Sequence, residues 1–126
     1  YGCGSGILAI AAARLGADHV VGVDIDPRAV IAARNNAEEN GVSARFLDSA
    51  HELHGQFDIV VANILANPLK VLAPLISAYV RQGGSLALSG ILFAQAEDLI
   101  AAYAPYLPLG ITDTPDGWIC LAGVKA

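Results

Sequence analysis

Short apolar segments alternate with longer segments of helical character along most of this 126-residue chain. The apolar segments, at residues 19–24, 44–48, 57–63 and 83–90, have the length and composition of buried strands. Helices are predicted between them and after them, at residues 5–15, 27–40, 68–81 and 94–104. This alternation predicts an α/β fold with a parallel sheet wound by helices on both faces, in which the strand at 57–63 is covered on both sides.

Local signals indicate where the predicted helices begin and end. Ser5 is the expected cap of the first helix, and Asp26 is expected to favour the start of the second by its charge. Pro27 then occupies a plausible first helical position, and Gly41 follows the last one. The third helix is expected to continue through Pro74.

The last part of the chain departs from the alternation. Residues 109–114 and 117–124 flank the turn sequence Pro-Asp-Gly and predict an antiparallel pair of strands with no helix between them. A doubly wound, mostly parallel sheet that ends in an antiparallel hairpin resembles the class I S-adenosylmethionine-dependent methyltransferases. In such a sheet, ligands bind at the carboxyl ends of the strands.

The chain begins with the sequence Tyr-Gly-Cys-Gly-Ser-Gly, in which Gly2, Gly4 and Gly6 alternate with larger residues. Asp24 follows about 20 residues later, at the end of the next predicted strand. Such glycines let a ligand approach the backbone, and such a carboxylate can accept hydrogen bonds from both hydroxyls of a ribose. We therefore predict a nucleoside-like ligand at these four residues; the alternative is a simple glycine turn and a solvent-facing Asp24.

The residues alone leave the identity of that ligand open between S-adenosylmethionine and a nicotinamide dinucleotide. The segment from Gly4 to Ala9 also satisfies the loose dinucleotide-binding pattern. A short-chain dehydrogenase would need a tyrosine followed four residues later by a lysine, and none of the four tyrosines has this neighbour. The methyltransferase interpretation is therefore favoured, and the oxidoreductase is kept as an alternative.

Two further positions take roles from the class resemblance. A side chain after the third strand of these enzymes commonly accepts a hydrogen bond from the adenine amine, which implies this role for Asp48. The alternative is a loop aspartate that bonds its own backbone. Asn63 follows the fourth strand, where the methyl donor meets the substrate, although Asn63 could also be a helix cap or a turn residue.

The residues after Asn63 bear on the kind of substrate. Methyltransferases of planar amides and nucleobases often have Asn-Pro-Pro-aromatic at this point, whereas Ile64, Leu65 and Ala66 stand here. Without an aromatic platform, an aliphatic amine is the favoured acceptor, with Ile64 and Leu65 against it and Asn63 as the catalytic residue. Burial beside apolar groups lowers the pKa of a lysine, and no general base is required.

The motifs from Gly2 to the carboxyl end together are similar to those of the bacterial ribosomal-protein methyltransferases of the PrmA type. The resemblance implies that residues 1–126 are an S-adenosylmethionine-dependent methyltransferase domain without its first strand and without the amino-terminal domain that recognises the ribosomal protein. It implies transfer to lysine or amino-terminal amines. The chain has no methionine, so we interpret it as a fragment, expected to be inactive alone and able to self-associate.

Composition excludes several other classes of protein. The net charge is −5 and the basic residues are scattered, which argues against direct binding of nucleic acid. No apolar run has the length of a membrane span, and the two cysteines form no metal-ligand or disulfide pattern. A cytoplasmic protein with no metal is therefore expected. Cys3 is rejected as a nucleophile, and His51 and His54 are interpreted as loop residues. A binding module without turnover remains the alternative to an enzyme.

Overall fold

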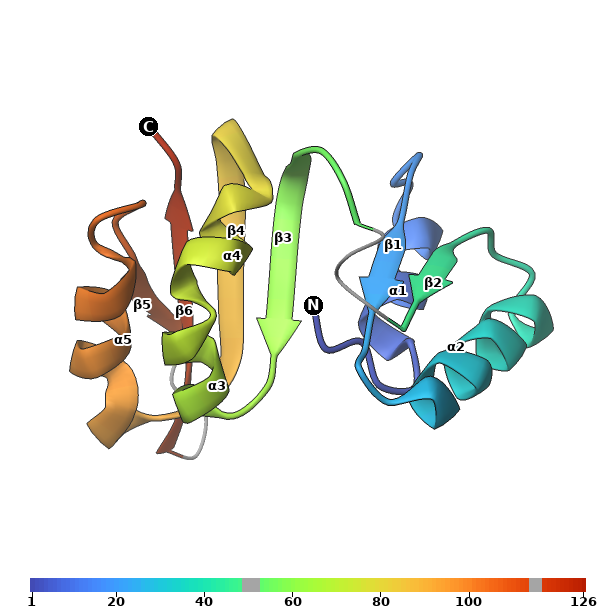
Figure 1. Cartoon of the computed structure of the whole chain (residues 1–126), viewed down its shortest axis with the longest axis horizontal. Helices are drawn as coiled ribbons and strands as arrows, with labels where there is room; N and C mark the ends of the chain where they lie inside the picture. The colour runs from blue at the N-terminus through green and yellow to red at the C-terminus, as the bar shows by residue number, and fades with distance from the viewer. Residues whose placement is uncertain (49–52, 114–116) are drawn as a thin grey trace. The chain divides into compact units, whose positions relative to one another are not determined.

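The computed structural model describes residues 1–48, 53–113 and 117–126. The chain divides into two compact units, Tyr1–His54 and Gly55–Ala126. Each unit combines helices and strands, which makes the protein a mixed α/β protein (Figure 1).

The first unit contains two helices and a pair of short strands. In chain order these elements are α1 (Ile7–Arg14), β1 (Val21–Val23), α2 (Pro27–Glu39) and β2 (Arg45–Leu47). Strands β1 and β2 are parallel, with Val23 opposite Leu47. The predicted strands and helices of this part of the sequence are therefore confirmed, with shorter bounds.

Helix α2 begins and ends as its sequence predicts. The Asp26 side chain accepts a hydrogen bond from the backbone N–H of Arg28, and Pro27 stands at the first helical position. Gly41 follows the end of the helix with a φ of 66°, a left-handed conformation that glycine adopts at little cost. For α1 the expectation was wrong, because Gly6 and not Ser5 is the cap residue, and no side chain bonds the helix end.

The core of the first unit lies between α2 and β2. Val30, Ala33, Ala37 and Phe46 are buried together, and Cys3 and Ile10 are among the half-buried residues that pack against them. The small alanine side chains on this face of α2 let the helix lie close to the loop that carries Cys3.

The second unit contains a four-stranded sheet and three α-helices. Its elements are β3 (Phe57–Asn63), α3 (Ala66–Val71), α4 (Ala73–Ala78), β4 (Val80–Leu92), η2 (Phe93–Gln95), α5 (Ala96–Tyr103), β5 (Gly110–Asp113) and β6 (Trp118–Val124). The strand order is β3-β4-β6-β5. Strand β3 is parallel to β4, and β6 is antiparallel to both of its neighbours. The predicted antiparallel closing pair is confirmed, while its Pro-Asp-Gly turn lies mostly outside the described residues.

Two expectations for this unit were wrong. The helix predicted through Pro74 is divided into α3 and α4, because proline has no N–H to donate to the carbonyl four residues earlier. Strand β3 is not covered on both faces: Val60 and Ala62 are buried, whereas Ile59 is 68% exposed. The alternating pattern shows that only one face of β3 packs into the core of this unit.

Helices α3, α4 and α5 pack against one another; α4 contacts β4 and α5 contacts β6 (Figure 1). The Tyr103 hydroxyl of α5 donates a hydrogen bond of 2.7 Å to the carbonyl of Leu69 in α3. Both residues are fully buried, so this bond joins two helices inside the core.

Candidate functional site

The glycine loop before α1 has the backbone that its sequence predicts. Gly2, Gly4 and Gly6 have φ angles of 71°, 52° and 85°, which are left-handed conformations that favour glycine. The N–H groups of Gly2 and Cys3 both donate to the carbonyl of Val23, at 2.7 and 2.9 Å. The loop is therefore attached to the carboxyl end of β1.

Asp24 joins the loop to the residues after β1. The N–H of Gly4 donates to one oxygen of the Asp24 carboxylate, and the N–H of Asp26 donates to the other, each at 2.9 Å. The structure thus brings together Gly4 and Asp24, which are 20 residues apart in the sequence. A carboxylate has about four lone-pair positions, so each oxygen of the half-buried Asp24 can accept one more hydrogen bond.

Two of the loop glycines face different surroundings. A Cβ at Gly4 would meet nothing within 4 Å, which leaves room for a ligand beside the backbone. A Cβ at Gly6 would lie 3.0 Å from the Cβ of Ala33 and 3.3 Å from the ring of Phe46. Gly4 therefore provides an open backbone, whereas Gly6 provides close packing against α2 and β2.

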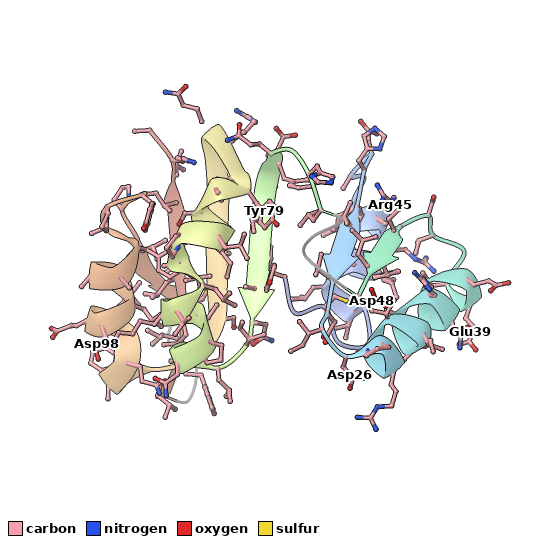
Figure 2. The ribbon with its side chains drawn as sticks, in the orientation of Figure 1. Asp26, Glu39, Arg45, Asp48, Tyr79 and Asp98 are labelled. Atoms are coloured by element: carbon pink, nitrogen blue, oxygen red, sulfur yellow. The ribbon has the colours of Figure 1, made fainter. Side chains whose placement is uncertain are left out.

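Asp48 lies at the carboxyl end of β2, beyond the pair that Val23 and Leu47 form (Figure 2). The N–H of Asp24 donates to the carbonyl of Leu47 at 3.1 Å, so Asp24 and Asp48 follow neighbouring strands at the same end. The Asp48 side chain is exposed and has no hydrogen bond within the described parts of the chain. Its role in binding the adenine amine stays a prediction.

The pKa of Cys3 argues against a nucleophilic role for its thiol. Burial, followed by the charge of Asp24, raises the pKa of the Cys3 thiol, which keeps it protonated at neutral pH. The hydrogen bond from the Arg28 side chain, and then that from the Arg28 N–H, lowers the pKa of Asp26. Asp26 is therefore a charged cap of α2, as the sequence predicts.

Asn63 is the last residue of β3, opposite Ser89 of β4. Its interpretation as a helix cap was wrong, since the cap position of α3 belongs to Leu65. The Asn63 side chain is exposed and has no hydrogen bond among residues 1–48, 53–113 and 117–126. Ile64 is half-buried and Leu65 is 72% exposed, so an open amide is followed by two accessible apolar side chains.

Sequence reasoning missed Gly90, which lies against Asn63. A Cβ on Gly90 would be 2.7 Å from the Asn63 Oδ1 atom and 3.1 Å from the carbonyl oxygen of Ile64. An isolated glycine inside an apolar strand is a recognised sign of a bulge or of close backbone approach. The sequence Leu-Ser-Gly-Ile-Leu therefore carried a signal that could have identified this contact.

The sequence analysis also named two loop histidines and expected no metal. His51 lies outside the described residues, and His54 is exposed. Within the described ranges, no three His, Cys, Asp or Glu side chains are grouped so that they could hold a metal ion. No helix in the same ranges is long and apolar enough to cross a membrane.

A glycine loop bonded to an acidic residue after the next parallel strand, followed by a sheet that closes with one antiparallel strand, is typical of the class I methyltransferase fold. A sequence profile of this class, "Ribosomal protein L11 methyltransferase (PrmA)", matches residues 1–126. The chain belongs to this family.

Individual relatives agree with the family assignment. The chain is 66% identical over 125 residues to the ribosomal protein L11 methyltransferase of Dechloromonas aromatica, covering 99% of this chain and 42% of that protein. The crystal structure of a ribosomal protein L11 methylase from Lactobacillus delbrueckii is 35% identical, with a TM-score of 0.92 over 98% of this chain and 67% of the other. The chain thus spans less than half the length of the curated relative.

A more distant structure shows the same fold. An RNA methyltransferase from Salinibacter ruber, solved in complex with S-adenosyl-L-homocysteine, is 23% identical with a TM-score of 0.75. The match covers 98% of this chain and 76% of the other. It extends the fold assignment to methyltransferases with other substrates.

Proposed function

We propose that this chain is the catalytic part of an S-adenosylmethionine-dependent methyltransferase that transfers methyl groups to lysine or amino-terminal amines of a ribosomal protein. The observation that carries the proposal is the hydrogen bond between Gly4 and Asp24, in a chain that belongs to the PrmA family. The name of the curated relatives supports ribosomal protein L11 as the partner. A ribosomal substrate implies that the protein acts in the cytoplasm.

We also propose that the strands are those of a doubly wound, mostly parallel sheet of the methyltransferase type. The parallel pairs β1–β2 and β3–β4 and the single antiparallel strand β6 support this interpretation.

The glycine loop and the two carboxylates fit the methyl donor. Asp24 has lone pairs left for the two ribose hydroxyls, and the open side of Gly4 admits the donor to the backbone. Gly2 and Gly6 hold the loop in its left-handed turns, and the exposed Asp48 accepts from the adenine amine. When bound, S-adenosylmethionine supplies an electrophilic methyl group.

The residues after β3 suit an aliphatic amine as the acceptor. A lysine has a pKa of about 10.4, so its neutral form costs roughly 4.6 kcal/mol at pH 7. Contact with Ile64 and Leu65 disfavours the ammonium ion and lowers this cost. The Asn63 Oδ1 atom accepts a hydrogen bond from the neutral amine and directs its lone pair, so that alignment and not proton abstraction is the contribution of the protein.

Two variants separate the donor role from the acceptor role in a full-length family protein that contains this sequence. Asp24→Ala removes a charged acceptor and should weaken S-adenosylmethionine binding by roughly ten- to a hundred-fold. Asn63→Ala should lower the rate of methyl transfer and change donor affinity by no more than a few fold. Calorimetry and a methylation assay with ribosomal protein L11 give the two quantities, with Asp18→Ala, an exposed position, as the control.

Three results would contradict the proposal. Unchanged donor affinity in Asp24→Ala would remove the ribose role. Tighter binding of a nicotinamide dinucleotide than of S-adenosylmethionine would favour the oxidoreductase. Donor binding with no transfer to any ribosomal protein would leave a binding module.

A further inference from the structure

Gly90 occupies an irregular point of β4. Its φ is 80°, a left-handed conformation that is rare inside a strand. The pairing of β4 with β6 is regular up to Leu88, shifts register, and resumes at Ile91. On the other side of β4, Ser89 is still in register with Asn63. The irregularity therefore lies beside the end of β3, where Asn63 begins the connection to α3.

Two oxygen atoms approach Gly90 on the side where other residues carry a Cβ. The Asn63 Oδ1 atom is 2.7 Å from the ideal Cβ position, and the backbone oxygen of Ile64 is 3.1 Å from it. A real Cβ essentially never has a neighbour at less than 3.0 Å, so a Cβ at residue 90 would force the end of the flexible Asn63 side chain to shift. The Ile64 oxygen belongs to the backbone, so both oxygens face the same point beside Gly90 and only one of them moves easily.

The Asn63 amide has a close neighbour at Gly90 and is otherwise accessible. Its side chain has no hydrogen-bond partner in the described ranges of the chain. Gly90 is its close neighbour, and the Asn63 residue is nevertheless exposed. A ligand can therefore bond the amide without displacing a partner from the described part of the chain.

We propose that Gly90 is a positioning residue for the methyl acceptor, which acts through Asn63. The missing side chain at residue 90 lets the Asn63 amide oxygen and the Ile64 carbonyl lie together as two acceptors for the N–H groups of one amine. This proposal rests on the proposed function of Asn63 and adds a residue to it. A methyl group at residue 90 would displace the amide, and a misplacement of about 1 Å at a reacting group can cost roughly a hundred-fold in rate.

The test compares two glycines with similar backbone strain in a full-length family protein. Gly90→Ala adds the Cβ beside Asn63, whereas Gly41→Ala has a φ of 66° and would place its Cβ where nothing lies within 4 Å. We expect Gly90→Ala to lower kcat by roughly ten- to a hundred-fold with donor Kd within about threefold. Gly41→Ala should change neither kcat nor donor Kd, because it introduces a similar backbone strain but no contact with Asn63.

A double variant shows whether the effect passes through Asn63. In an Asn63→Ala background the Gly90→Ala substitution should cause little further loss of kcat, because the displaced group is gone. The same cycle covers poor folding, because Asn63→Ala removes the 2.7 Å contact but leaves the 3.1 Å contact with the Ile64 oxygen and the left-handed φ. If Gly90→Ala does not fold, the double variant should therefore be more stable than Gly90→Ala. A full additional loss of kcat, or a double variant no more stable than Gly90→Ala, would overturn the role of Gly90.

A measurement that does not depend on turnover separates this proposal from the proposed function. The side-chain amide resonances of Asn63 in an NMR spectrum should shift in Gly90→Ala and stay in place in Gly41→Ala. Unmoved resonances, or a Gly90→Ala protein with wild-type kcat, would overturn the positioning role. If the resonances shift in Gly90→Ala but the wild-type protein methylates no ribosomal protein, the proposed function is overturned and the effect of Gly90 on the position of Asn63 is not.

Discussion

Gly4 and Gly6 are two residues apart in the same loop, and both have a left-handed backbone. An alanine at either position costs about 1–2 kcal/mol from the backbone conformation alone. At Gly6 the new Cβ would also meet Ala33 at 3.0 Å, and overpacking of this kind costs about 1–3 kcal/mol more. We therefore expect Gly6→Ala to lower the free energy of unfolding more than Gly4→Ala does.

Donor affinity should rank the same two variants in the opposite order. A Cβ at Gly4 projects into the open space where the proposed ligand approaches the backbone, so Gly4→Ala should weaken S-adenosylmethionine binding beyond its effect on stability. Urea unfolding and calorimetry in a full-length family protein measure the two effects. Equal losses of stability in both variants would show that the contact between Gly6 and Ala33 is unimportant.

At the scale of single residues, the sequence predicted that the glycine loop and Asp24 belong together, because their spacing is a local signal, while their binding of the methyl donor stays a prediction. Three alternating glycines and an acid about 20 residues later define a loop and a strand end, and the structure joins them through Gly4 and Asp24. The contact between Gly90 of β4 and Asn63 of β3 was not predicted, because a glycine signals an irregular strand but does not show which residue lies against it.

At the scale of the elements, the hydrogen bond from Tyr103 to Leu69 connects helix α5 to helix α3. The Leu69 carbonyl belongs to the last turn of α3, where a helix has no internal donor for its carbonyls. Tyr103→Phe would leave this buried oxygen without a partner, which should cost about 1–3 kcal/mol of unfolding free energy. Tyr106→Phe, at a position that is 40% exposed, is the matched control and should change stability little.

The same tyrosine should give the protein a dependence on alkaline pH. Burial raises the pKa of Tyr103 far above its ordinary value, which is about 10 in an unfolded chain. The folded state thus keeps this proton at a pH where the unfolded state loses it. The contribution of Tyr103 is therefore complete below pH 10 and decreases as the pH rises above it. Urea unfolding between pH 8 and pH 11 should show a smaller decrease in Tyr103→Phe; an identical decrease would contradict the assignment.

Some element boundaries could be predicted from the sequence and others could not. The bounds of the strand at residues 57–63 and the start of α2 were predicted closely, because β-branched residues and an Asp-Pro pair are local signals. The division of α3 from α4 and the exposed face of β3 were not predicted. The apolar spacing continues across Pro74, and an apolar residue such as Ile59 does not indicate whether another element covers it.

At the scale of the whole molecule, the position of β3 at the edge of its sheet bears on whether the isolated 126-residue chain self-associates. Strand β3 stands at one end of the described four-stranded sheet, and Ile59 on it is 68% exposed. Edge strands with exposed apolar side chains pair readily with other chains. We predict that the isolated chain self-associates through β3 in a concentration-dependent way. We also expect it to transfer no methyl groups, because other copies then occupy the edge of β3, the strand that ends at Asn63.

Sedimentation velocity over a range of concentrations tests this prediction. The average mass of the isolated chain should exceed the 13.0 kDa of the monomer and rise with concentration. Ile59→Lys places a charge on the edge strand and should move the mass toward that of the monomer. Leu15→Lys removes a side chain that is 88% exposed and lies outside the strands, so it should leave the association unchanged. A mass of 13.0 kDa at every concentration, or equal effects of the two lysines, would show that β3 does not drive association.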